Sequence, residues 1–272
     1  MWRIILLLIC MSCTDLLFQD TSKYNSILFN GNAWIQIEND DNDISIMNDA
    51  FTLEFWFTGG NSGTSESACL ISIVDENGAI KFGLFKDPLS PNSFEVWLND
   101  TRLNPISLNL NEDLNSGLYF HHLAITSNQN IEIYLDGSKI KTLSGLIIEI
   151  GENDLSIGGK VNHDLSTLGN FWTGNIDEMR LWSSELNATI ISFHYNNPEK
   201  LAESYEDSYV TSLAGLWRFQ FEAGDTSPII PDESCDIITQ IFTNTPSICP
   251  NVGDVTIYTL ENNVVTFSEK HP

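Results

Sequence analysis

Basic residues are scarce in this chain. Its 272 residues include 12 Lys and Arg against 37 Asp and Glu, which gives a formal net charge of -25. Such an excess of carboxylates repels the phosphates of nucleic acids and the anionic surface of a membrane. We therefore expect no nucleic acid partner and no direct lipid surface. Two interpretations of the acidity remain: it favours cations, calcium above all, or it keeps a secreted protein in solution.

Several motifs of phosphate and acyl chemistry are missing. The chain has no P-loop, no glycine-rich dinucleotide fingerprint and no serine nucleophile elbow. It also shows no internal repeat with a period of about 20 to 50 residues. We therefore expect neither a nucleotide-binding enzyme nor a solenoid or propeller.

Cysteine is rare, with five in the chain. Cys10 and Cys13 fall in the N-terminal segment, which leaves Cys69, Cys235 and Cys249. In an exported protein Cys235 and Cys249 are the natural pair, closing a loop whose stabilisation is about 3 kcal/mol on the chain-entropy model. Cys69 is then a buried thiol. Three pairings exist, and the sequence does not choose between them.

One long apolar run is present, at the start of the chain, and it is too short to span a bilayer as a finished helix. It predicts a secretory signal over residues 1–12. Ser12 directly before Cys13 resembles a bacterial lipoprotein signal, in which that cysteine receives lipid after cleavage. The alternative is an ordinary cleaved signal. We expect a secreted or cell-surface protein, tethered by residues 13–26, that meets the membrane only through lipid on Cys13.

The rest of the chain is a succession of short alternating runs separated by Gly, Asn, Asp and Ser. This rhythm predicts an all-β sandwich. The hydrophobic fraction of 42% is enough to fill one interior, and we expect one domain over residues 27–272. Strands are expected at 27–37 and 51–57, and a final hairpin at 254–267. Alternation points one set of side chains inward, Ile35, Ile37, Leu53, Phe55 and Phe57, and another outward, Trp34, Glu54 and Trp56.

The segment 171–186 has the clearest pattern. It opens with a turn at Gly174, alternates for six residues and breaks into a short helical run. Period-two alternation places Asp177 on the same face as Met179 and Leu181. An inward carboxylate must be hydrogen-bonded, paired with a cation or bound to a metal, because burying it alone is costly. Asp177 is therefore the first candidate for a site.

Six segments in this order resemble successive elements of laminin-G-like, concanavalin A-like lectin domains: FNGNAWIQI (29–37), FTLEFWF (51–57), HHLAIT (121–126), IEIYLDG (131–137), LSIG (155–158) and GNIDEMRLW (174–182). The resemblance covers 27–221 and leaves 222–272 as a C-terminal extension. It implies a jelly-roll β-sandwich of two antiparallel sheets in which the first and closing strands pair. Two short helices are expected after it, capped by Ser184 and by Asn197.

The resemblance also implies a calcium ion at the rim of the sandwich. Carried over by position, the ligands are Asp177 with Asn30 and Asn32 of the first turn, and calcium would neutralise the inward carboxylate. The alternative is that Asp177 accepts backbone N–H bonds from that turn and fixes the strand register without a metal.

Several aromatic residues fall on outward faces or in a turn. Flat aromatic rings suit pyranose stacking, so these residues are candidates for a sugar-binding face. The alternative is that the rings pack over Glu54 and Arg180 or lie beneath loops and helices. The candidates are Trp34, Trp56, Tyr134, Trp172 and Trp182.

The acids do not follow the pattern of an enzyme on this fold. The glucanases of the family that this chain resembles carry three acids at alternate positions of one strand, so that all three lie on one face. Asp177 and Glu178 are instead neighbours and are expected to point to opposite faces. We therefore expect a binding module that is not an enzyme and takes an extracellular glycan or a matrix or surface protein. The second alternative is a structural adhesion module with protein contacts alone, and the third is a glycoside hydrolase with a non-standard site.

Overall fold

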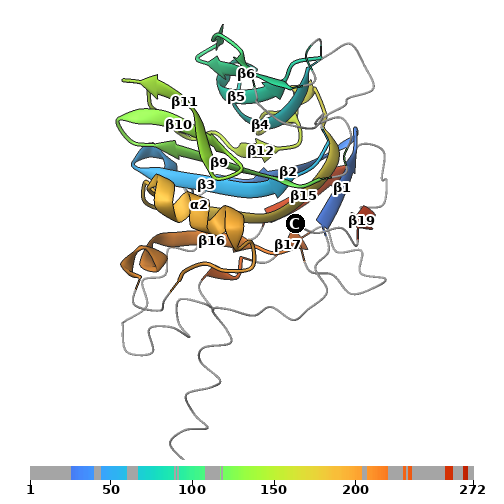
Figure 1. The fold of residues 1–272 in the computed structure, drawn as a ribbon. Helices are drawn as coiled ribbons and strands as arrows, with labels where there is room; N and C mark the ends of the chain where they lie inside the picture. Colours follow the sequence, from blue (N-terminus) through green and yellow to red (C-terminus); the bar gives the residue numbers. More distant parts are fainter. Residues whose placement is uncertain are drawn as a thin grey trace, which may run out of the picture.

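Two antiparallel sheets packed face to face form the described part of the chain (Figure 1). The structure is a computed structural model that describes residues 26–39, 44–59, 67–88, 90, 92–107, 117, 119–203, 207–219, 229–230, 232–234, 255–259 and 266–268. The signal at 1–12, the lipid site at Cys13 and the pair Cys235 and Cys249 lie outside these residues, so they stay predictions.

The first sheet has eight strands. Their order is β11 (Ser138–Ser144), β10 (Asn130–Leu135), β9 (His121–Ser127), β3 (Phe51–Phe57), β15 (Thr173–Trp182), β1 (Ser26–Asn30) and β19 (Thr266–Ser268), with β16 (Leu213–Trp217) also paired to β15.

The second sheet has nine strands. Their order is β17 (Ile229–Ile230), β18 (Val255–Thr259), β2 (Ala33–Ile37), β12 (Leu155–Ile157), β4 (Ala68–Val74), β5 (Ile80–Lys86), β6 (Ser93–Leu98) and β7 (Thr101–Arg102), with β8 (Ile106–Ser107) also paired to β6. A small hairpin of β13 (Lys160–Val161) and β14 (Leu168–Gly169) stands apart from both sheets.

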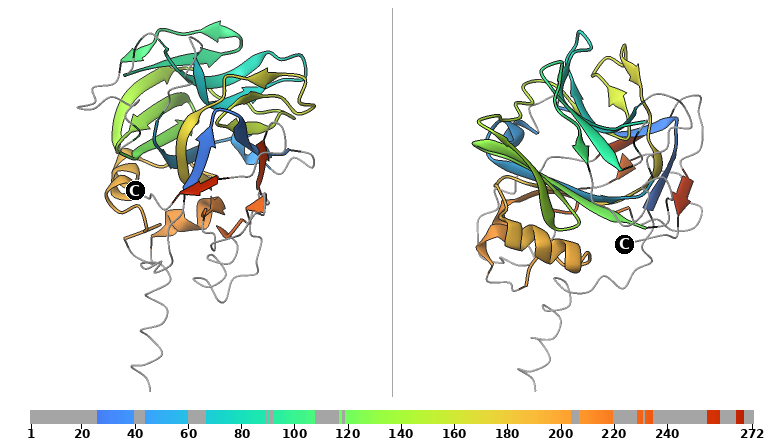
Figure 2. Two further views of the ribbon diagram at one scale, coloured as in Figure 1. Left: turned by 90° about the vertical axis from the view of Figure 1, so that its right-hand side faces the viewer. Right: turned by 45° about the horizontal axis from the view of Figure 1, so that its top comes forward.

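One helix, α2 (Ala188–Asn196), and the 3-10 turns η1 (Ser45–Asn48) and η3 (Ser208–Ser212) complete the described elements. The helix crosses the outer face of the first sheet, while β4, β5 and β6 lie on the opposite side of the sandwich (Figures 1 and 2). No helix in the described ranges has the length and apolar character needed to cross a bilayer.

The inner faces of the two sheets share one hydrophobic core, as alternation predicts. Ile35 of the second sheet and Met179 of the first belong to the same buried cluster. All five side chains expected to point inward are also members of it. The expected pairing of the first and closing strands is present, since β1 runs antiparallel to β15. The all-β jelly-roll sandwich predicted from the sequence is therefore confirmed.

Residues 27–37 are two strands in different sheets, not the single strand that the sequence predicts. The chain leaves β1 of the first sheet and enters β2 of the second at Gly31. Gly31 has a φ of 88°, which a residue without a side chain adopts at little cost. The Gly31 N–H also donates to the Trp172 carbonyl oxygen at 3.1 Å. A glycine in the middle of an alternating run therefore marks the edge of the sandwich.

The final hairpin predicted at 254–267 is also wrong. β18 pairs with β2 in the second sheet, whereas β19 pairs with β1 in the first. The two strands that follow residue 254 therefore extend separate sheets, and no local sequence pattern distinguishes this arrangement from a hairpin.

Helix α2 begins three residues later than predicted. Asn187, not Ser184, is its N-cap, and its side chain accepts N–H bonds from Thr189 and Ile190 at 2.9 and 3.1 Å. The Ser184 hydroxyl instead contacts the Ser212 hydroxyl at 2.6 Å. The second helix predicted from Asn197 is a turn.

Candidate functional site

The strand β15 carries a β-bulge that decides which side chains reach its outer face. Asp177 lies opposite Trp56 of β3, but the next paired residue, Arg180, lies opposite Glu54. Glu178, at the bulge, has a φ of 36°. Two residues of β15 therefore oppose one of β3, and Asp177 shares the outer face with Arg180. The prediction that Asp177 points into the core is wrong, because period-two counting fails across a bulge.

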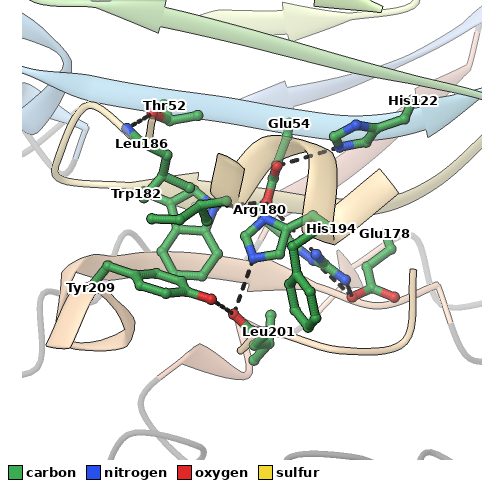
Figure 3. A network of polar contacts seen from close by, with 12 residues as sticks. Thr52, Glu54, His122, Glu178, Arg180, Trp182, Leu186, His194, Leu201 and Tyr209 are labelled. Atoms are coloured by element: carbon green, nitrogen blue, oxygen red, sulfur yellow. Dashed lines mark hydrogen bonds and ion pairs between the residues drawn. The ribbon is translucent and has the colours of Figure 1, made fainter. Parts of the chain in front are cut away.

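The carboxylate of Glu54 lies at the centre of a buried polar network on this outer face (Figure 3). Its Oε1 accepts the Trp182 indole N–H at 2.9 Å and lies 2.8 Å from His194 Nδ1. Its Oε2 lies 3.3 Å from His122 Nε2. Arg180 Nη1 is 3.7 Å from Oε1. The carboxylate side chain is fully buried, so protein groups replace water around its charge.

His194 joins helix α2 to this carboxylate. Its second ring nitrogen, Nε2, lies 3.0 Å from the Leu201 carbonyl oxygen, which also accepts the Tyr209 hydroxyl at 3.0 Å. Both ring nitrogens of His194 therefore face oxygen atoms, so this side chain links the Glu54 carboxylate to the segment that follows α2.

Arg180 supplies the guanidinium of the network, which faces Glu54 and Glu178. Its Nε and Nη2 donate to Glu178 Oε1 at 2.9 and 2.5 Å, and Nη2 also donates to the Pro198 carbonyl oxygen. The guanidinium lies 4.8 Å from the centroid of the Trp56 ring, in a cation–π contact. Two carboxylates, Glu54 and Glu178, thus face the guanidinium of Arg180, and the His194 ring also contacts Glu54.

Burial and neighbouring charges shift the pKa values of three groups in this layer. Burial opposes the ionisation of Glu54, but His194 and His122 hold its pKa well below the usual value. Burial lowers the pKa of His122, which therefore stays neutral. Burial and the charge of Glu178 raise the pKa of Asp177 well above its usual value.

The network is therefore a structural tie between α2 and the sheet, closed to solvent. The alternation of 51–57 predicts that Glu54 points outward, but it does not indicate the partner His194. The signal available for His194 is its place on the buried face of α2, three residues after Ile191.

The five aromatic residues predicted as a sugar-binding face are buried. Tyr134 and Trp182 belong to the cluster beneath α2, Trp56 lies under Arg180, and Trp172 belongs to the main core. Trp34 stacks on Phe171 with ring centroids 5.7 Å apart. Each ring is at most 2% exposed. The alternative interpretation, that these rings lie beneath other elements, is the arrangement found.

The structure does not bring the predicted calcium ligands together. Asn30 of β1 pairs with Thr173, four positions before Asp177 on β15, and four strand residues span roughly 13 Å. Asn32 lies in the turn beyond Asn30, further from Asp177 along the register. Among the described residues no group of three or more His, Cys, Asp or Glu is arranged to hold a metal ion. Calcium binding stays a prediction.

Trp97 differs from the other tryptophans. Of the six that the structure describes, the other five are buried, whereas Trp97 is half-buried. It lies on the outer face of β6, because Phe94 and Val96 on the same strand point into the core. The strand pairing places it opposite Gly83 of β5 and Arg102 of β7. Trp97 is not among the predicted sugar-binding residues, although the alternation of 94–98 indicates that it points outward.

A charged pair stands beside this ring. Arg102 Nη2 donates to Glu95 Oε1 at 2.6 Å. The second oxygen, Oε2, accepts the Trp97 indole N–H and the Ser67 hydroxyl, both at 3.4 Å. The Phe85 ring meets Trp97 edge to face, with centroids 6.5 Å apart. Trp97, Glu95 and Arg102, named the Trp97 surface below, combine an apolar ring with a donor and an acceptor.

Comparisons with known proteins agree with this architecture. A family model described as "Concanavalin A-like lectin/glucanases superfamily" matches residues 29–192. The comparison with curated proteins gives no match.

Similar folds occur among solved structures. A candidate carbohydrate-binding protein from Bacteroides ovatus ATCC 8483 is 14% identical, with a TM-score of 0.56; the alignment covers 92% of this chain and 61% of that one. A heptameric SAP-like pentraxin from Limulus polyphemus is 13% identical, over 65% of this chain and 78% of that one, with a TM-score of 0.43. A Trypanosoma rangeli sialidase is 15% identical, over 69% and 29%, with a TM-score of 0.48. At these identities the likeness shows the fold alone.

Replacing the buried carboxylate tests the tie between α2 and the sheet. We expect Glu54→Gln to lower the free energy of unfolding by about 3 kcal/mol, because it leaves buried cations without their counter-charge. Lys139→Ala is the control, since it breaks the exposed Lys139–Glu132 pair and should cost less than about 1 kcal/mol. Urea unfolding of the three proteins measures the difference. Equal costs for the two variants would contradict a stabilising network.

Because of His122, the protein should lose stability as the pH falls below about 6.5. Its pKa is lower in the folded protein than in the unfolded chain, so below about pH 6.5 the unfolded state binds the extra proton. The stabilisation is therefore present above that pH and is lost as the pH falls towards the folded pKa. Urea unfolding between about pH 7 and pH 5 should show a shallower pH dependence for His122→Gln than for the unaltered protein. Parallel curves would exclude His122 as the cause.

Proposed function

This chain belongs to the concanavalin A-like lectin/glucanases superfamily, whose family model spans residues 29–192, and from that premise we propose that it binds a glycan at the cell surface or in the extracellular matrix without catalysis. The Bacteroides ovatus protein of similar fold is itself a candidate carbohydrate-binding protein. This chain spans 61% of that protein's length. The proposal therefore concerns what the described sandwich can bind.

The Trp97 surface is the observation that carries the proposal. Binding sites for sugars need an apolar face for the ring carbons and polar groups for the hydroxyls. Trp97 supplies the partly exposed ring, and Glu95 and Arg102 supply an acceptor and a donor beside it. The pair is fixed by a charge-assisted hydrogen bond, so little ordering is needed on binding.

The burial of the strongly shifted carboxyl groups supports a role without catalysis. The pKa of Glu54 is held well below its usual value and that of Asp177 well above it, a combination that suits acid and base chemistry. However, they are 0% and 4% exposed, and the charge of Glu54 is already balanced within the network. A screen of the protein on β-glucans tests this point, and turnover that Glu54→Gln abolishes would overturn it.

A glycan array of the full chain, run with calcium and with EDTA, tests glycan binding and the predicted ion together. We expect binding to neutral glycans, because the net charge of -25 disfavours anionic ones. Loss of binding in EDTA would support a calcium requirement. Equal binding in both buffers would contradict a calcium requirement. Absence of any glycan binding would favour the structural adhesion module instead.

A location at the cell surface is part of the proposal, supported by the N-terminal apolar run that ends before Cys13. Expression in a bacterium that is fed labelled palmitate should give a labelled protein. Cys13→Ala should abolish the label, because the lipid is attached to that thiol. No incorporation, or incorporation that survives the substitution, would contradict the anchor.

A further inference from the structure

We propose that the Trp97 surface binds a neutral pyranose through two adjacent hydroxyl groups, with the indole of Trp97 under the sugar ring. The inference rests on the proposed function and names its site and ligand class. It depends on three features of the described residues: the position of the indole, the unequal use of the two Glu95 oxygens, and the charge of the surface.

The indole of Trp97 is held in place before any ligand binds. The Phe85 ring contacts it edge to face, and its N–H points to Glu95. Its neighbour across the strand pair, Gly83, has no side chain, and the Phe85 ring lies where a Cβ at Gly83 would be. The indole therefore packs against Phe85 beside Gly83. The half-buried Trp97 ring offers the flat apolar area that the C–H face of a pyranose requires.

The two oxygens of Glu95 are used unequally. Oε1 makes a short charge-assisted bond to Arg102 at 2.6 Å. Oε2 receives only two contacts of 3.4 Å, from Trp97 and Ser67, well beyond the usual 2.7 to 3.0 Å or so. The side chain of Glu95 is 9% exposed, so the carboxylate is not completely closed to a ligand. A sugar hydroxyl donating to Oε2 would complete its hydrogen bonding.

Arg102 supplies the complementary donor. Its side chain is 47% exposed, and a guanidinium has five N–H groups in a rigid fork. The bond to Glu95 uses Nη2, which leaves other N–H groups of the fork beside the same carboxylate. One hydroxyl can therefore donate to Glu95 while the adjacent hydroxyl accepts from Arg102.

Charge selects a neutral sugar over an acidic one. Glu95 and Arg102 cancel each other, so the site itself has no net charge to attract a carboxylate or sulfate. The nearby Lys81 is paired with Asp75 at 3.1 Å. The whole chain carries an excess of 25 negative charges, which opposes the approach of an anionic glycan.

The test is calorimetric titration of the full chain with neutral oligosaccharides of glucose, mannose and galactose, and with polygalacturonate as the acidic probe. We expect a neutral sugar to bind. Trp97→Ala and Glu95→Gln should each weaken it by about tenfold or more, because they remove the stacking face and the charged acceptor. Trp97→Phe should retain more affinity than Trp97→Ala, because it keeps a flat ring.

Lys139→Ala is the matched control. It removes the cation of an exposed pair on the other sheet, at 2.8 Å and with the Lys139 side chain 45% exposed, and it should bind as the unaltered protein does. Urea unfolding of every variant must match the unaltered protein before affinities are compared. Neutral sugar binding that survives Trp97→Ala would overturn this site but not glycan binding. Binding of polygalacturonate alone would overturn the ligand class, and binding of no glycan would overturn both proposals.

Discussion

The negative charge of Glu54 has no access to water, and the outer layer of the first sheet is arranged around the need to balance it. The imidazole ring of His194 from α2, a guanidinium from the neighbouring strand and an indole N–H meet at one carboxylate (Figure 3). Removing any one of these partners would leave a buried charge uncompensated, at a cost greater than that of an exposed ion pair. The position of α2 over the sheet is therefore fixed by electrostatics as well as by apolar packing.

This covering layer also determines where the molecule can meet a ligand. The outer face of the first sheet carries Glu54, Tyr134 and Trp182, but α2 and the segment after it bury them. The Tyr134 and Trp182 rings, which would suit sugar stacking, instead pack beneath α2. The β6–β7 edge of the second sheet is different, since the half-buried Trp97 lies there beside the ion pair of Glu95 and Arg102. The proposed binding surface therefore lies on the sheet that α2 does not cover.

Much of the fold followed from the alternation of side chains. The inward set that contains Ile35 and Phe55 is in the core, and the outward set that contains Glu54 and Trp56 is on the outer face. The alternation failed at one place, the bulge at Glu178, where an extra residue moved Asp177 to the other face. A bulge has no strong local signature, so its position could not be obtained by counting along the strand.

The sequence by itself determined the class of the fold, the facing of most strand residues and the pairing of the first strand with the closing one, because these depend on periodicity and on an ordered set of family segments. The tertiary structure decided which outward face meets water, which sheet each strand joins after Gly31, and that His194 reaches Glu54 from α2. The contact of His194 with Glu54 joins residues more than a hundred positions apart, and a local pattern carries no information about what packs on top of it.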